Sequence, residues 1–70
     1  MKRFIIEFQS KTVPENRGYF YRPRKVGFSS VYNIDMARKF KTEELARRCL
    51  QHLEEVEGEW YTFEIKMIEI

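Results

Sequence analysis

The residues with the most chemical content lie between Arg17 and Tyr32, where basic and aromatic side chains are interleaved. Arg and Lys can neutralise a phosphate backbone, and flat rings can stack on unpaired bases. The same residues also fit a purely structural role, because aromatic residues of short strands are usually core and scattered basic residues usually serve solubility. The candidate nucleic-acid-binding residues are Arg17, Tyr19, Tyr21, Arg22, Arg24, Lys25 and Tyr32.

The charge of the chain is divided between its two halves. Residues 1–41 carry ten basic and three acidic side chains, a formal charge of +7, whereas residues 42–70 carry three basic and eight acidic ones, a formal charge of −5. The acidic half would repel a duplex laid across both halves. A split of opposite charges also suits a contact between proteins. We therefore expect a role in protein–protein contact, with a homodimer or another protein as partner, and keep DNA or RNA binding as the alternative.

Catalytic and metal-binding chemistry finds little support in the sequence. The single histidine, His52, follows the single cysteine, Cys49, by three residues, but two ligands from one helix do not make a structural zinc site. The clustered glutamates after His52 have no partner suited to general acid–base catalysis. The three glycines form no phosphate-binding loop. We expect a non-enzymatic protein with no cofactor, no metal and no small-molecule substrate.

The chain length limits the number of domains and the size of the hydrophobic core. Seventy residues make one domain, 1–70, and a chain of this size buries only about 60% of the surface it exposes when unfolded. Small folds are often stabilised by disulfides or by a partner subunit. Because a single cysteine excludes an intramolecular disulfide, self-association becomes the more favoured of the two. One reduced cysteine, with no apolar run long enough for a membrane span or a signal sequence, predicts a cytoplasmic protein without a membrane partner.

A helix is predicted over Thr42–Glu57, and it is the clearest element of the chain. Its apolar residues recur at spacings of one, three and four, which places them on one stripe. Thr42 is the expected N-cap and Gly58 the stop. On the opposite face two glutamates precede two arginines by four residues, a spacing that favours ion pairs. The stripe consists of Leu45, Ala46, Cys49, Leu50, Leu53 and Val56.

Strands are indicated by alternation and by aromatic content. Arg3–Gln9 and Trp60–Ile70 alternate, and Tyr19–Arg22 is aromatic. Ser10–Gly18 reads as a loop, and Arg24–Ser30 can be either a strand or a turn. We therefore predict an α+β fold, an antiparallel-rich sheet of three to five strands with one helix packed on one face, in the order β-β-(β)-β-α-β.

The alternation of the last strand changes phase near its end. A strict period of two sends Ile68 and Ile70 to the face opposite Phe63, so either a bulge returns them to the core or that second face is covered by a partner or a swapped chain end. An exposed apolar face of this kind would be buried against a second copy. The candidate self-association residues are Ile5, Trp60, Ile68 and Ile70.

Several segments together resemble a type of short phage and prophage open reading frame product. The matching segments are Arg3–Ile6, Tyr19–Tyr21, Asp35–Phe40, Thr42–Ala46 and Phe63–Ile65. The stretch that follows the aromatic segment departs from this pattern. The resemblance implies a strand-rich sheet with one helix, an accessory role, and no inherited catalytic residues.

Overall fold

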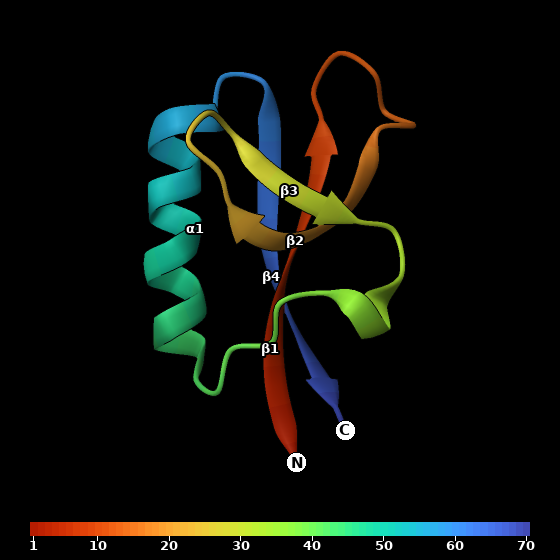
Figure 1. Ribbon diagram of the computed structural model, residues 1–70, viewed down its shortest axis with the longest axis vertical. Helices are drawn as coiled ribbons and strands as arrows, with labels where there is room; N and C mark the ends of the chain where they lie inside the picture. Colours follow the sequence, from red (N-terminus) through yellow and green to blue (C-terminus); the bar gives the residue numbers. More distant parts are fainter.

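Four antiparallel strands in one sheet, with a single α-helix, form the computed structural model, which describes residues 1–70 (Figure 1). This confirms the predicted α+β class, with three strands before the helix and one after it. The strand order in the sheet is β3-β2-β1-β4. The elements are β1 (Lys2–Ser10), β2 (Arg17–Pro23), β3 (Phe28–Val31), the 3-10 helix η1 (Ile34–Met36), α1 (Glu43–Glu57) and β4 (Tyr61–Glu69).

Strand β1 is paired very differently along its two sides. It pairs with β4 over its whole length, from Lys2 opposite Glu69 to Ser10 opposite Tyr61, but with β2 only over residues 7–9. Strands β2 and β3 then turn away and cross in front of β1 and β4 (Figure 1). The sheet is therefore rolled, with its concave side facing the helix.

The edge of β1 that β2 leaves is taken up by the segment before the helix. The Phe4 N–H donates to the Phe40 carbonyl at 2.9 Å, and the Phe40 N–H donates to the Phe4 carbonyl at 2.8 Å. The Arg38 N–H donates to the Phe20 carbonyl at 3.0 Å. These bonds satisfy backbone groups that the short β1–β2 pairing would otherwise leave unpaired, and they fix where α1 begins.

The core lies between the rolled sheet and the helix. Leu50 and Leu53 of α1 pack with Ile6 of β1 and Phe20 of β2. The predicted stripe is wider than the surface that the sheet covers, so Leu45 and Val56 at its margin stay exposed. The half-buried residues around this cluster are Phe28, Phe40, Cys49, Phe63 and Ile65.

Both predicted helix ends are present, with one difference in mechanism. The Thr42 Oγ1 accepts from the Leu45 N–H at 3.2 Å, as an N-cap does. Gly58 ends the helix in the right-handed region, with φ of −64°, and not in the left-handed region typical of a glycine stop. A Cβ at Gly58 would run into the Glu54 carbonyl, so close approach is the reason for glycine here. The predicted ion pairs, both 3.0 Å long, are Glu43–Arg47 and Glu44–Arg48.

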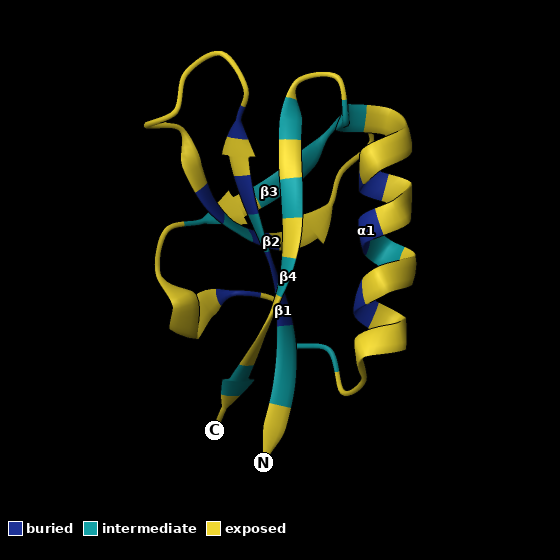
Figure 2. Cartoon of the chain, turned by 180° about the vertical axis from the view of Figure 1, so that it is seen from behind, coloured by how far each residue is buried: buried dark blue, intermediate teal, exposed yellow.

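The convex face of the sheet explains the phase change in β4. The β1–β4 register has no bulge, so Ile68 stays opposite Arg3 on this face. Ile5, one diagonal step from Ile68, is fully buried. Figure 2 shows α1 on one side of β1 and β4 and η1 on the other. Ala37, which follows η1 in the chain, is also buried. The convex face is thus covered at Ile5 by other residues of the same protomer. The sequence had suggested a partner or a swapped chain end as the cover.

The core assignment is tested by Leu53→Ala. Because Leu53 is only 3% exposed and sits in the central cluster, the substitution should lower the free energy of unfolding by about 2 to 5 kcal/mol. Leu45→Ala is the matched control, since Leu45 is 46% exposed on the same helix and should cost far less. Urea unfolding of the three proteins gives the comparison. Equal midpoints for wild type and Leu53→Ala would show that the helix packs through another face.

Candidate contact surfaces

The basic hairpin lies at the turn between β2 and β3. Arg22, Arg24 and Lys25 are all exposed, and none of them takes part in an ion pair. The turn is closed by a 3.2 Å hydrogen bond from the Arg24 N–H to the carbonyl of Gly27, whose φ of 78° suits glycine. The Arg22 guanidinium lies 5.7 Å from the centre of the Tyr21 ring. The β2–β3 turn therefore brings together four of the seven predicted nucleic-acid-binding residues: Tyr21, Arg22, Arg24 and Lys25.

The other three predicted residues lie elsewhere, on the convex face near the start of β2. Arg17, Tyr19 and Tyr32 line a shallow cavity of about 430 Å³ together with two acids, Glu7 and Glu15. Arg22, the nearest cation of the basic hairpin, is five strand positions from Arg17, roughly 17 Å along β2. The structure thus divides the predicted set into two groups, and the second group is charge-mixed.

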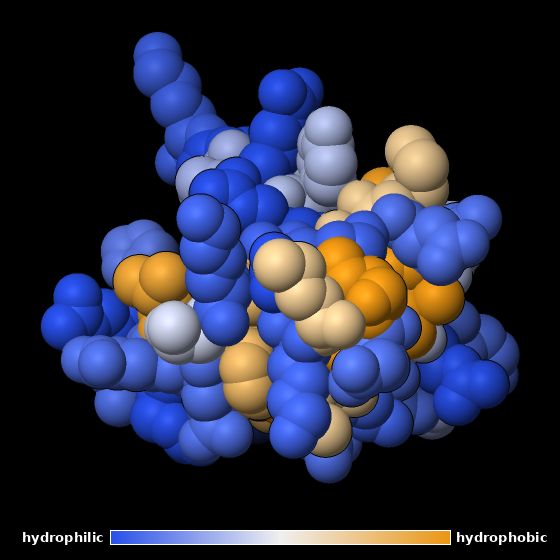
Figure 3. Space-filling view, turned by 90° about the horizontal axis from the view of Figure 1, so that it is seen from below, coloured by the Kyte–Doolittle hydropathy of each residue, from blue (hydrophilic) through white to orange (hydrophobic).

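The predicted self-association residues are also spread over the protomer. Ile5 is buried and has no surface to offer. Ile68 and Ile70 lie at the end that carries both termini, where Ile70 donates its N–H to the Met1 carbonyl at 2.8 Å. Seen from below, apolar side chains gather on this end among polar ones (Figure 3). Trp60 is 56% exposed at the opposite end of β4, so no single patch on one protomer contains all four residues.

Strand β4 presents a free edge along nine residues. It is the last strand of the sheet, and α1 packs on its face and not along its edge (Figure 2). Hydrogen bonds from Lys11 to Trp60 and from Ile70 to Met1 show that the even-numbered residues of β4 bond to β1. By the alternation of an antiparallel ladder, the odd-numbered residues point their N–H and C=O groups outward. These residues are Tyr61, Phe63, Ile65, Met67 and Glu69.

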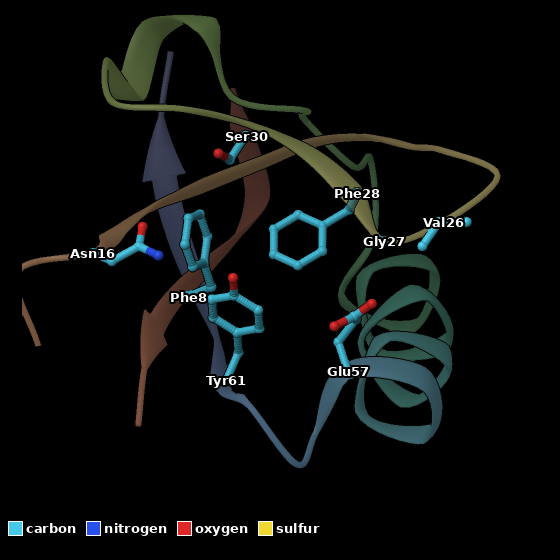
Figure 4. A pocket seen from close by; sticks show the side chains of 8 residues that line it. All are labelled: Phe8, Asn16, Val26, Gly27, Phe28, Ser30, Glu57 and Tyr61. Carbon is cyan, nitrogen blue, oxygen red and sulfur yellow. The ribbon is translucent and has the colours of Figure 1, made fainter. Parts of the chain in front are cut away.

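A second concave feature, the aromatic cup, opens at the end of the roll opposite the termini. Its floor is made by Phe8, Phe28 and Tyr61, which come from three different strands (Figure 4). Its rim includes Asn16, Ser30, the β2–β3 turn and Glu57, the last residue of α1. The cavity has a volume of about 350 Å³. The sequence gives no signal for this site, because its three floor residues are 20 and 33 positions apart in the chain and share no motif.

The three rings of the cup stand nearly perpendicular to one another. Phe8 and Phe28 have ring centres 5.1 Å apart at 76°, Phe28 and Tyr61 5.5 Å at 75°, and Phe8 and Tyr61 5.6 Å at 86°. Edge-to-face contacts of this kind are favourable because the edge of one ring is positive and the face of the next is negative. The rings therefore hold each other in fixed orientations.

Cys49 borders the core on the helix flank that faces Arg38. Burial raises the pKa of the Cys49 thiol above its ordinary value, and the positive charge of Arg38 only partly opposes this effect. A thiol that stays protonated at neutral pH is a poor nucleophile. This agrees with a packing role for Cys49.

No helix in the structure combines the length and the apolar character that crossing a membrane requires. No model of a known protein family, no curated protein and no solved structure matches this chain.

The raised pKa of Cys49 makes a prediction about stability. Because the folded state keeps the thiol protonated at a pH where the unfolded state loses its proton, the contribution of Cys49 should decline as pH rises above about 8.5, the ordinary thiol pKa. The stability difference between wild type and Cys49→Ala, measured by urea unfolding from neutral to mildly alkaline pH, should shrink. A difference that stays constant across this window would contradict the burial effect.

Proposed function

We propose that this protein is a small, non-enzymatic accessory protein of the cytoplasm that acts by protein–protein contact as a homodimer, with two copies paired through β4. The observation that carries the proposal is that β4 is complementary to itself when a second copy runs antiparallel about Ile65. The single free cysteine and the resemblance to short phage and prophage products support the cytoplasmic, accessory role.

The backbone of β4 suits this pairing. When Ile65 meets Ile65 of the partner subunit, the outward-facing odd-numbered residues meet one another, so their N–H and C=O groups are satisfied in pairs. The two four-stranded sheets become one continuous sheet, and the twofold axis stands perpendicular to it. Such an edge, if left open, is a general template for unwanted pairing.

The outer row of side chains supports the same register. Glu64 comes opposite Lys66 of the partner subunit, twice by symmetry. Within a protomer Glu64 has no ion pair and lies opposite another acid, Glu7, an arrangement that is unfavourable in a sheet. The ion pair of Glu7 with Lys66 of the same protomer, 3.4 Å long, offsets only part of this repulsion. The partner's Lys66 would offset that repulsion.

The apolar side chains support it as well. Trp60 comes opposite Ile70 of the partner subunit, and both are more than half exposed in the protomer, at 56% and 59%. On the inner row the exposed Met67 meets Phe63 of the partner subunit, a sulfur–aromatic pairing. The predicted residues Trp60 and Ile70, distant within one chain, are thus neighbours in the dimer.

Neighbouring registers are unfavourable by charge. Moving the twofold axis by one residue places either Glu64 opposite its own copy or Lys66 opposite its own copy, and like charges directly opposite are destabilising. The register about Ile65 is therefore the favoured one. A chain in which ten of 70 residues are buried has little core, so added sheet pairing also matters for its stability.

The dimer is tested by exchanging the two charges. Glu64→Lys relieves the repulsion from Glu7 within the protomer but faces Lys66 of the partner subunit twice, so association should weaken about tenfold or more. The double variant Glu64→Lys/Lys66→Glu should dimerise again. Sedimentation equilibrium over a range of protein concentrations measures this, and the wild-type melting temperature should rise with concentration.

Glu59→Lys is the control for this experiment. It makes the same charge change in the exposed turn before β4, outside the paired row, and should leave the dimer intact. A wild-type protein that is monomeric at high micromolar concentration, or a double variant that fails to dimerise, would reject the β4 pairing.

Nucleic-acid binding is the second candidate function, and the basic hairpin favours it. Three exposed cations without ion pairs surround Pro23, next to the exposed Tyr21 ring. Such a group suits phosphate contacts with one stacking platform. The acids beside Arg17 and Tyr19 restrict this candidate surface to the hairpin.

Replacing the three hairpin cations, Arg22, Arg24 and Lys25, by Ala tests this second function. If they contact phosphates, affinity should fall for all sequences alike, and the salt dependence for a duplex should decrease by about one unit of slope per lost contact. A filter-binding titration against salt measures both. The control removes three exposed lysines elsewhere: Lys2, Lys11 and Lys41. A wild-type protein that binds neither DNA nor RNA at about 50 mM salt would exclude this function.

A further inference from the structure

The aromatic cup contains a carboxylate that has no partner. Glu57 is half-buried, and its side chain makes no hydrogen bond and no ion pair in the protomer. In Figure 4 its carboxylate points toward the space beside Phe28. Gly27 of the facing turn leaves room for this carboxylate, since a Cβ added at Gly27 would stand 3.5 Å from the Glu57 Oε1.

The surroundings of Glu57 add to the negative electrostatic potential of its carboxylate. As the last residue of α1 it lies where the helix dipole places partial negative charge, and that end of the helix carries no basic side chain. Three further glutamates, at 54, 55 and 59, surround it in sequence. Beside Glu57 a positive charge is therefore favoured over an anion, and Arg24 and Lys25 of the facing turn do not line the cavity.

The aromatic floor of the cup favours an organic cation over a metal ion. Phe28 and Tyr61 are half-buried and border the cavity, and ring faces attract a cation placed within about 6 Å. A hard metal ion would need six or more oxygen ligands, whereas the cup offers one carboxylate and a few neutral oxygens. A cation with an apolar shell matches both the rings and the carboxylate.

We propose that the aromatic cup binds an organic cation, an alkylated ammonium or a guanidinium, with its charge against Glu57 and its apolar groups against Phe28 and Tyr61. The volume of about 350 Å³ accommodates a group of this size and is within the range of ligand pockets. Asn16 and the Tyr61 hydroxyl supply polar groups at the rim for orientation. All the residues of this site come from one protomer.

The cation can come from a free small molecule or from a side chain of another protein, and two probes separate these sources. Choline represents a free alkylated ammonium, and Nα-acetyl-arginine amide represents an arginine side chain. Each is titrated into ¹⁵N-labelled protein at constant ionic strength, and amide shifts are followed by NMR. We expect saturable shifts at Gly27, Phe28, Glu57 and Tyr61 with at least one probe, and the tighter probe identifies the source.

The role of charge is tested first on the wild-type protein. The uncharged carbon analogue of choline, 3,3-dimethylbutan-1-ol, has the same shape and should bind about tenfold more weakly, because it loses the attraction to the carboxylate and the ring faces. Equal binding of the analogue would overturn the proposal in favour of a simple apolar pocket. The absence of saturable shifts with both cations would also overturn it.

Two variants test whether Glu57 is the carboxylate that binds the cation. Glu57→Gln should weaken cation binding about tenfold while leaving the melting temperature near that of wild type, because the side chain has no partner to lose. Glu55→Gln removes the same charge from an exposed position of the same helix and should change affinity less than twofold. Equal losses in the two variants would show that the cation responds only to the overall acidity of the helix end, and would overturn the site.

Discussion

The unequal pairing of β1 is the constraint on which the rest of the structure depends. Because β1 pairs with β4 over nine positions but with β2 over only three, the sheet must roll where β2 departs. The roll places Phe20 and Phe28 over the inner faces of β1 and β4, and it leaves a gap on β1 that the Phe40 backbone fills. The same roll leaves β4 as a long free edge and opens the aromatic cup at one end, so both proposed sites follow from one departure in pairing.

Local patterns in the sequence were sufficient for the elements but not for their arrangement. The period of two in β1 and β4, the stripe of α1 and the Thr42 cap are signals within about 15 residues, and each one predicted its element. The β2–β3 turn was ambiguous because Gly27 and Pro23 interrupt the alternation that Val26 and Phe28 suggest. The bond pair between Phe4 and Phe40 has no local signal, since it depends on where β2 leaves β1.

The candidate sites were predictable only where they lie in one stretch of chain. The basic hairpin was found because Arg22, Arg24 and Lys25 are adjacent in sequence. The free edge of β4 could not be found, because which residues point outward depends on the register with β1. Ile5 was assigned to an exposed apolar face because alternation identifies a face without showing what covers it, and in the structure Ile5 is fully buried within the protomer. The aromatic cup depends on three strands meeting, which no spacing encodes.

The division of charge along the chain has a different meaning once the fold is known. The β2–β3 turn, which carries Arg24 and Lys25, lies beside Glu57 at the acidic end of α1, so the two halves partly offset each other within one protomer. Tyr61 belongs both to the floor of this cup and to the outward-facing edge of β4. If the two proposed contacts are coupled through Tyr61, thermodynamic reciprocity requires that the cation strengthen the dimer by the same factor as dimerisation strengthens cation binding.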